Sequence, residues 1–259
     1  MTDRAAKRFN GVAANFATSE VHRTSATIER LRNVLAVPDG ATVCDVACGA
    51  GHLGMSFAAD GAEVTLLDPA PAMLEQVRLG ASERGLSVEV LLTAAEEIPL
   101  PSNTFDVVVS RLAPHHFGDI RRAVSEMARI TAPGGRVAII DLQGDPDPGA
   151  DELLHRIEVL HDPTHVRSYP TEAWKALLEG AGLVLELFEP DHRESPDGVP
   201  IARWCEIAGS GREAEDEIRL VLQQADSELL EALWITHDGV DFRYPVRTLL
   251  AVFRKSEPS

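Results

Sequence analysis

The segment Val43-Cys-Asp-Val-Ala-Cys-Gly-Ala-Gly-His-Leu-Gly54 passes from a short apolar stretch directly into a run of glycines. We expect a β-strand, a tight turn and the start of a helix. Glycine lets the backbone approach a ligand closely, and a helix N-terminus offers free N–H groups at its positive end. Gly49, Gly51 and Gly54 satisfy the pattern G-x-G-x-x-G, which alone would also suit a dinucleotide. The segment therefore predicts a nucleoside- or nucleotide-binding turn.

Two acidic residues narrow the choice of ligand. Asp45 lies inside the expected first strand, shortly before Gly49. A pyrophosphate would be repelled by this carboxylate, whereas the ammonium of an amino-acid group would be attracted to it. Asp68 ends the next apolar stretch, where an acidic side chain can accept hydrogen bonds from ribose hydroxyls. The pair favours a ligand that carries both an amino acid and a ribose.

The first 140 residues or so alternate between two patterns. Short β-branched or aliphatic runs are separated by helical spacing such as that of Ile120, Val124 and Met127. Strands alternating with helices predict an α/β fold with a parallel sheet covered on both faces. The expected strands are 42–46, 64–67, 88–92, 105–109 and 137–140.

The regular alternation of strand and helix patterns ends after Asp141. We expect a sixth strand at 183–188 and a hairpin-like return through 240–244 and 248–253. The ranges 144–167 and 195–231 are interpreted as helical insertions that cap the core. Upstream, Val21, Ile28, Leu31 and Leu35 predict an amphipathic helix.

Four ordered motifs carry a resemblance to a known family. These are the 43–51 segment, Leu66-Leu-Asp-Pro-Ala-Pro-Ala-Met-Leu, the stretch 94–111 and Ala132-Pro-Gly-Gly-Arg-Val-Ala-Ile-Ile-Asp. Together they resemble class I S-adenosylmethionine-dependent methyltransferases, and most of all the small-molecule subgroup similar to the enzymes of ubiquinone and menaquinone biosynthesis. The resemblance implies a Rossmann-like sheet of seven strands, mostly parallel with the last strand antiparallel, helices on both faces and helical cap insertions.

The same resemblance implies a division of the chain and a set of cofactor contacts. Residues 1–41 would form an N-terminal helical segment that covers the cofactor, 42–142 the S-adenosylmethionine-binding core, and 143–259 the cap insertions plus the last two strands of the sheet. Asp45, Ala47 and Gly49 would surround the methionyl end, and Asp68 would hold the ribose. The full set of implied cofactor-binding residues is Phe16, Asp45, Ala47, Gly49, Gly51, Asp68, Pro69, Ala95, Glu96 and Arg111, with Phe9 as a second closing aromatic.

Histidines supply the candidates for chemistry. His115 and His116 follow the fourth strand, at the carboxyl edge where ligands of open α/β sheets bind, so one of them could act as a general base. The other reading is a histidine that caps a helix or supports the cofactor. His161, His165 and Arg167 lie in the first insertion and are candidate substrate contacts. Cys44 and Cys48 are explained by the glycine turn, so no metal site is expected.

Composition limits the partners. The 259 residues carry 24 Lys and Arg against 41 Asp and Glu, a net charge of −17, which disfavours nucleic acid and anionic membrane surfaces. With three cysteines and no signal-like start, we expect a cytoplasmic monomer or homodimer that acts on a small molecule. Two other functions stay open: a protein that binds S-adenosylmethionine without methylating, and a nicotinamide-dependent oxidoreductase.

Overall fold

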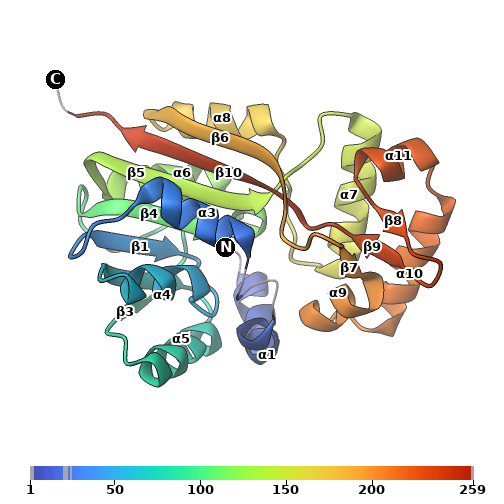
Figure 1. Ribbon diagram of the computed structural model, residues 1–259, viewed down its shortest axis with the longest axis horizontal. Coiled ribbons are helices and arrows are strands. Elements are labelled where there is room, and N and C mark those ends of the chain that lie inside the picture. The colour runs from blue at the N-terminus through green and yellow to red at the C-terminus, as the bar shows by residue number, and fades with distance from the viewer. Residues whose placement is uncertain (1–2, 20–22, 24, 258–259) are drawn as a thin grey trace.

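A computed structural model describes residues 3–19, 23 and 25–257 of the chain. Its main element is a seven-stranded sheet of order β3-β2-β1-β4-β5-β10-β6 (Figure 1). The strands are β1 (Thr42–Val46), β2 (Glu63–Asp68), β3 (Glu89–Leu92), β4 (Phe105–Arg111), β5 (Thr131–Leu142), β6 (Leu183–Arg193) and β10 (Arg247–Lys255). Strand β10 runs antiparallel to both β5 and β6, and the pairs among β1 to β5 are parallel. The predicted seven-stranded Rossmann-like sheet is confirmed.

Helices cover both faces of this sheet. On one face, α6 (Ile120–Ile130) and α8 (Thr171–Gly180) bury Met127 and Trp174 against Cys44 and Val137. On the other face lie α3 (Ala26–Leu35), α4 (His52–Ala59) and α5 (Pro71–Arg84), which pack against side chains of alternate strand positions such as Val43 and Val109. Successive strand residues point to opposite faces, so a parallel strand covered twice must be apolar throughout. Val21 of the expected upstream helix lies outside the described residues.

The cap is a second body beside the carboxyl edge of the sheet, on the right of Figure 1. It contains α7 (Pro148–His161), α9 (Ile201–Ala208), α10 (Arg212–Gln224), α11 (Ser227–Ala232) and a small sheet of β7 (Val199–Pro200), β8 (Thr236–His237) and β9 (Phe242–Tyr244). These elements have their own core, in which Leu153, Trp204 and Ile218 are buried. The two predicted insertions build most of this cap.

The expected hairpin through 240–253 is wrong. Strand β9 pairs with β7 and β8, whereas β10 pairs with β5 and β6. The chain turns between them at Pro245, which lacks an N–H group, and at Val246, whose φ is 47°. The buried Tyr244 meanwhile ties β9 to α7 by a hydrogen bond to Glu158.

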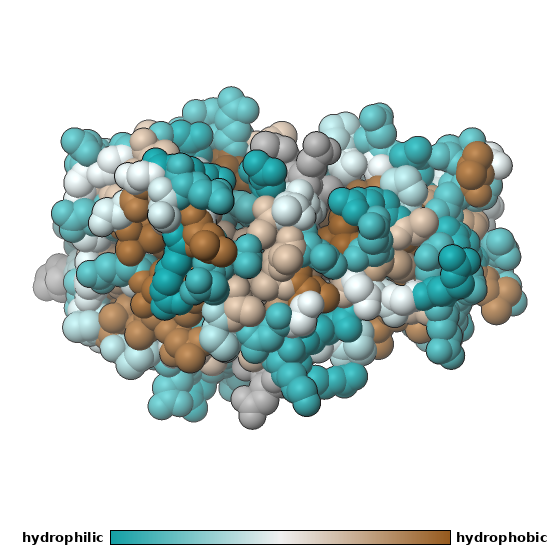
Figure 2. Space-filling view, turned by 90° about the horizontal axis from the view of Figure 1, so that it is seen from below, coloured by the Kyte–Doolittle hydropathy of each residue, from teal (hydrophilic) through white to brown (hydrophobic). Residues whose placement is uncertain are grey.

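Helix α1 (Asp3–Thr18) bridges the two bodies. Its Asn10 Oδ1 accepts a hydrogen bond of 2.9 Å from the backbone N–H of Ala72 in α5, and its Arg8 donates one of 2.9 Å to the carbonyl of Ala208 in α9. Seen from below, the surface is mainly hydrophilic with separate hydrophobic groups (Figure 2). The helix thus lies across the junction at which ligands of such sheets bind.

Candidate active site

The turn between β1 and α4 depends on two glycines with positive φ. Gly51, at φ 79°, caps α4, and a Cβ there would lie 2.9 Å from side-chain atoms of both Leu66 and Val77. Gly49, at φ 54°, differs because a Cβ would meet no heavy atom within 4 Å. Gly51 is therefore required by packing against the sheet, whereas Gly49 faces open space.

Asp45 and Asp68 stabilise this turn by accepting hydrogen bonds from its backbone. Asp45 Oδ2 accepts a hydrogen bond of 2.8 Å from the backbone N–H of Gly54. Asp68 accepts one of 2.9 Å from Gly49 and one of 2.8 Å from Ala70. Burial raises the pKa of Asp45 to about 7 and that of Asp68 to about 6. The ionised form of each carboxylate is thus less stable here than in water. A positively charged or hydrogen-bonding group placed beside it would stabilise that form.

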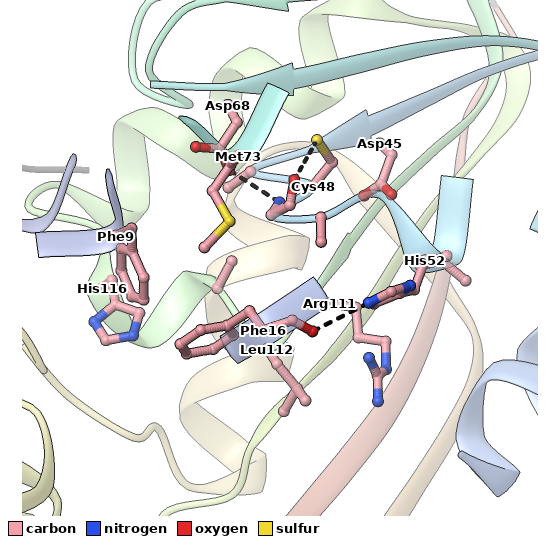
Figure 3. A pocket seen from close by; sticks show the side chains of 15 residues that line it. Phe9, Phe16, Asp45, Cys48, His52, Asp68, Met73, Arg111, Leu112 and His116 are labelled. Carbon is pink, nitrogen blue, oxygen red and sulfur yellow. Dashed lines mark hydrogen bonds between the residues drawn. The ribbon is translucent and has the colours of Figure 1, made fainter. Parts of the chain in front are cut away.

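A first cavity, with about 600 Å³ of empty space, opens above the turn (Figure 3). Six residues of the predicted cofactor set line it: Phe16, Asp45, Ala47, Gly49, Asp68 and Arg111. Helix α1 closes one side through Phe9 and Phe16, and the carbonyl of Phe16 accepts a hydrogen bond of 3.2 Å from His52 Nε2. The predicted closing aromatics therefore lie at the cavity.

Arg111 reaches this cavity from the end of β4. Its guanidinium forms an ion pair of 2.9 Å with Glu194, and both side chains are almost completely buried. Glu194 also accepts hydrogen bonds from Thr27 (2.6 Å) and Thr248 (3.0 Å). The positions of Arg111 and of the start of α3 thus depend on a carboxylate distant in sequence.

A second cavity, with about 680 Å³ of empty space, lies between the sheet edge and the cap. The two cavities share the side chains of Phe9, Phe16, Leu112 and His116. The remaining wall of the second cavity is mixed, with apolar side chains such as Leu142 and Val246 beside His115 and Glu158. The two cavities therefore adjoin along these four side chains.

The two predicted catalytic histidines lie in the short 3-10 helix η1 (Pro114–His116) after β4. His115 Nδ1 lies 2.6 Å from Asp141 Oδ1. His116 Nδ1 lies 3.1 Å from the carbonyl oxygen of Thr164, so this nitrogen carries the proton and Nε2 keeps its lone pair. Both rings line the second cavity, and His116 lines the first as well.

The two rings differ in basicity. Burial lowers the pKa of His115, but the attraction of Asp141 outweighs it and raises the pKa above its ordinary value. Burial and the neighbouring His115 lower the pKa of His116 to about 3. His115 is therefore the stronger proton acceptor of the pair, and His116 is neutral at physiological pH.

Comparison with known proteins identifies the fold and the chemistry. Residues 44–139 match the family model described as a methyltransferase domain. The uncharacterized methyltransferase YcgJ of Bacillus subtilis is 30% identical over 195 residues, which cover 75% of this chain and 76% of that protein. This chain belongs to the S-adenosylmethionine-dependent methyltransferase family. It is a class I methyltransferase, as its motifs predicted, and its cofactor is S-adenosylmethionine.

Three further similarities agree with this assignment. The crystal structure of YcgJ superposes with a TM-score of 0.80 at 26% identity, covering 90% of this chain and 99% of YcgJ. A putative methyltransferase from Bacillus halodurans C-125 gives 0.82 at 25% identity, covering 88% and 98%. In sequence, the demethylmenaquinone methyltransferase of Thermus thermophilus is 34% identical over 161 residues, covering 54% of this chain and 73% of that enzyme.

The lining of the first cavity of this methyltransferase fits its cofactor. The amino-acid part of S-adenosylmethionine carries an ammonium and a carboxylate, and the cavity offers the carboxylate of Asp45 and the guanidinium of Arg111. Gly49 leaves free the space that a Cβ would occupy. The charged side chains of the lining and the open space beside Gly49 are therefore compatible with a zwitterionic nucleoside.

Four residues of the predicted cofactor set lie outside the first cavity lining. Gly51 packs against β2 and α5, and Ala95 is buried in the core next to the sheet. Pro69 is half-buried directly after Asp68. The Glu96 carboxylate accepts a hydrogen bond of 3.0 Å from the backbone N–H of Gly118, ahead of α6.

The predicted substrate residues also lie partly inside and partly outside a cavity lining. His161 lines the second cavity, where its ring stacks on Trp204 with centroids 3.8 Å apart. His165 is buried behind the wall, with its ring centroid 5.5 Å from that of His115. Arg167 is exposed and forms a surface ion pair of 2.6 Å with Asp151. Of these three side chains, only that of His161 lines the second cavity.

Sequence reasoning missed several polar residues of the second cavity. Glu158 and Asp162 line it from α7 and its end, and Tyr244 lines it from β9. Glu158 accepts a hydrogen bond from the Tyr244 hydroxyl, and burial raises its pKa to about 7. A carboxylate in an amphipathic helix is ordinarily exposed, so only tertiary burial distinguishes Glu158 from its neighbours.

Two searches of the described residues gave negative results. No group of three or more His, Cys, Asp or Glu side chains in residues 3–19, 23 and 25–257 could hold a metal ion. Over the same ranges, no helix is both long enough and apolar enough to cross a membrane.

Proposed function

We propose that this enzyme transfers the methyl group of S-adenosylmethionine, held in the first cavity, to an O, N or C atom of a small organic acceptor held in the second cavity. One observation carries the proposal: the two cavities adjoin, because Phe9, Phe16, Leu112 and His116 line both of them. Methyl transfer requires the acceptor atom and the methyl group to approach in line with water excluded. Adjoining cavities under one helical cover provide such an arrangement.

The cofactor-binding roles follow from the first cavity. Asp45 would hold the ammonium, Arg111 the carboxylate and Asp68 the ribose hydroxyls, with Ala47, Gly49 and Phe16 in contact with the ligand. Residues 42–142 would then be the binding core and residues 1–41 the cover, because α1 supplies Phe9 and Phe16. When bound, the cofactor supplies an electrophilic methyl group on a sulfonium.

A histidine of the protein would remove the proton that the acceptor loses on methylation. His115, with Nδ1 directed at Asp141, presents Nε2 to the second cavity and would accept a proton from a hydroxyl, amine or activated carbon. Asp141 would orient the ring and stabilise the protonated imidazole. His116 would contribute to the shared wall, and His161 would contact the acceptor. Arg167 is left out of this proposal.

The size and charge of the protein support a small acceptor. The second cavity lies between the sheet edge and the cap, and the net charge of −17 opposes nucleic acid. Cysteine-poor composition and charge are also why we place the enzyme in the cytoplasm, as a monomer or homodimer.

A labelled-methyl assay tests the proposal. The protein is incubated with methyl-labelled S-adenosylmethionine and a low-molecular-weight metabolite fraction, and small-molecule products are separated from protein. We expect label in a small molecule with the wild-type protein and much less with His115→Gln. Cofactor binding without transfer of label to any small molecule would contradict the proposal and would favour a protein that binds the cofactor for another purpose.

A further inference from the structure

We infer that the second cavity selects an uncharged acceptor, and that Glu158 together with Tyr244 is the polar anchor that orients it. This inference rests on the proposed function, in which the second cavity holds the acceptor. Neither residue was a candidate on sequence grounds. The inference follows from the charges around the cavity and from the geometry of this pair.

The cation nearest the cavity wall is already neutralised. Arg8 Nε lies 2.9 Å from Asp162 Oδ1, and the same guanidinium donates a hydrogen bond of 2.9 Å to the carbonyl of Ala208. Within the described part of the chain, no Lys or Arg side chain lines the second cavity. A carboxylate or phosphate on the acceptor would therefore be buried without a positive partner, which costs several kcal/mol.

The histidines of the wall add no unbalanced positive charge near neutral pH. Burial lowers the pKa of His116 and of His161 to about 3 in each case. Asp141 raises the pKa of His115, but its carboxylate lies 2.6 Å from His115 Nδ1 and balances the charge of a protonated ring. Glu158 and Asp162 moreover line the cavity, so an anionic acceptor would be placed beside carboxyl groups.

A cationic acceptor is disfavoured because the carboxyl groups at the cavity already have partners. Asp162 is paired with Arg8, and Glu158 accepts a hydrogen bond from the Tyr244 hydroxyl. Burial raises the pKa of Glu158 to about 7, so at neutral pH it does not carry a full negative charge. Much of the remaining wall is aliphatic, with Leu112, Leu142, Val199, Ile207 and Val246.

Glu158 and Tyr244 are held in position. The Tyr244 ring stacks on Trp204 with centroids 4.2 Å apart, and Trp204 stacks on His161 at 3.8 Å. Glu158 Oε1 accepts from Tyr244, whereas Oε2 lies 3.9 Å from His165 Nδ1, beyond hydrogen-bond distance. No hydrogen bond to Oε2 occurs among the described residues, so this oxygen can engage a hydroxyl or amide of the acceptor.

The test uses three bicyclic probes of similar shape: naphthol, its carboxylate analogue hydroxynaphthoate, and its ammonium analogue aminomethyl-naphthol. Binding to the protein saturated with S-adenosylhomocysteine is measured by calorimetry at neutral pH. We expect naphthol to bind at least about tenfold more tightly than either charged probe, as follows from one uncompensated buried charge. Equal or tighter binding of a charged probe, or no binding of any of them, would overturn the inference.

A substitution of Glu158 tests whether this residue is responsible for the binding of the uncharged probe. Glu158→Gln should weaken naphthol binding up to about tenfold, the effect of losing one hydrogen bond, while the affinity for S-adenosylhomocysteine stays unchanged. Glu152→Gln, an exposed position on the same helix, is the matched control and should have no effect. A Glu158→Gln variant that binds naphthol as the wild type does contradicts the anchor role.

A second variant gives a gain of binding and does not depend on loss of function. Asp162→Asn removes the partner of Arg8, so hydroxynaphthoate should bind several-fold more tightly than to the wild type. Unchanged hydroxynaphthoate affinity counts against the inference. If S-adenosylhomocysteine itself fails to bind the wild type, the proposed function fails; if it binds and the probes show the wrong preference, the inference alone fails.

Discussion

His115 Nδ1 lies 2.6 Å from Asp141 Oδ1, and both side chains are buried. Asp141 lies in β5, while His115 follows β4 in the η1 turn. Parallel neighbouring strands bring the two together, because Arg111 of β4 pairs with Ile140 of β5. The contact engages His115 Nδ1, so in the neutral ring Nε2 is the nitrogen that can accept a proton, as a general base requires.

The basicity of His115 should depend on Asp141. Asp141→Asn removes the charge that raises the pKa of His115, so burial dominates and the pKa should fall below 6.5. Imidazole signals in an NMR pH titration measure it directly, without any acceptor. Asp151→Asn, in a surface ion pair with Arg167, is the control and should leave the His115 titration unchanged. A His115 pKa that is the same in wild type and Asp141→Asn would refute this relationship.

Cofactor affinity should rise with pH through about 7. Asp45 has a pKa of about 7 in the free protein because burial disfavours its charge, and a bound ammonium would favour the ionised form. The complex then holds fewer protons than the free protein, so binding releases a proton and strengthens as pH rises, levelling off above the pKa. Calorimetry in buffers of different ionisation enthalpy, on either side of pH 7, detects this release. Asp45→Asn should abolish it; equal proton release by that variant speaks against the assigned role.

Gly49→Ala should remove cofactor binding at little cost in stability. Gly49 and Gly85 have similar positive φ values, 54° and 65°, and a Cβ at either meets no heavy atom within 4 Å. Alanine at either position should cost roughly 1 kcal/mol of unfolding free energy from backbone strain. Only Gly49 faces the first cavity, so only Gly49→Ala should weaken S-adenosylmethionine, as measured by calorimetry alongside urea unfolding. Full cofactor affinity in Gly49→Ala would place the ligand elsewhere.

Asp68 should affect cofactor binding in two ways. Asp68→Ala removes the acceptor for ribose hydroxyls and also the two hydrogen bonds that hold Gly49 and Ala70. We expect the binding free energy to weaken by at least about 1.5–3 kcal/mol, the range for a hydrogen bond to a charged group. Asp60→Ala, which removes an exposed carboxylate paired with Arg32, should leave calorimetric affinity unchanged. Wild-type affinity in Asp68→Ala would be incompatible with its role.

Glu194 should stabilise the fold through Arg111. Glu194→Ala removes the carboxylate from the buried ion pair with Arg111, and breaking a buried pair costs about 3–5 kcal/mol. Urea unfolding should show this loss, whereas Glu206→Ala, in an exposed pair with Arg203, should change stability by less than about 1 kcal/mol. Equal effects of the two substitutions would show that the Glu194 network contributes little.

Local patterns predicted the core of the fold well. Strand β1 occupies the expected residues Thr42–Val46, because an apolar run that ends in glycines specifies both a buried strand and its turn. Asp45, Asp68 and Gly49 were assigned to the cofactor site from the same local signal, and all three line the first cavity. The predicted partner of strand 242–244 was wrong, because the strand character of a segment does not specify which strand it pairs with.

The acceptor side depends on contacts between distant residues. Glu158 and Tyr244 are 86 positions apart, and Arg111 and Glu194 are 83 apart. Nothing in the spacing of either pair indicates contact, because each depends on how the cap docks on the sheet. Arg167, close in sequence to His165, was expected at the substrate but lies on the surface with Asp151.

A crystal structure of the protein with S-adenosylhomocysteine tests the central claim most directly, because it locates the cofactor sulfur relative to both cavities. The account predicts the ligand above the Gly49 turn, its ribose at Asp68, and its sulfur open to the second cavity beside Leu112 and His116. A ligand bound outside the first cavity, or one whose sulfur faces away from the second, would contradict it.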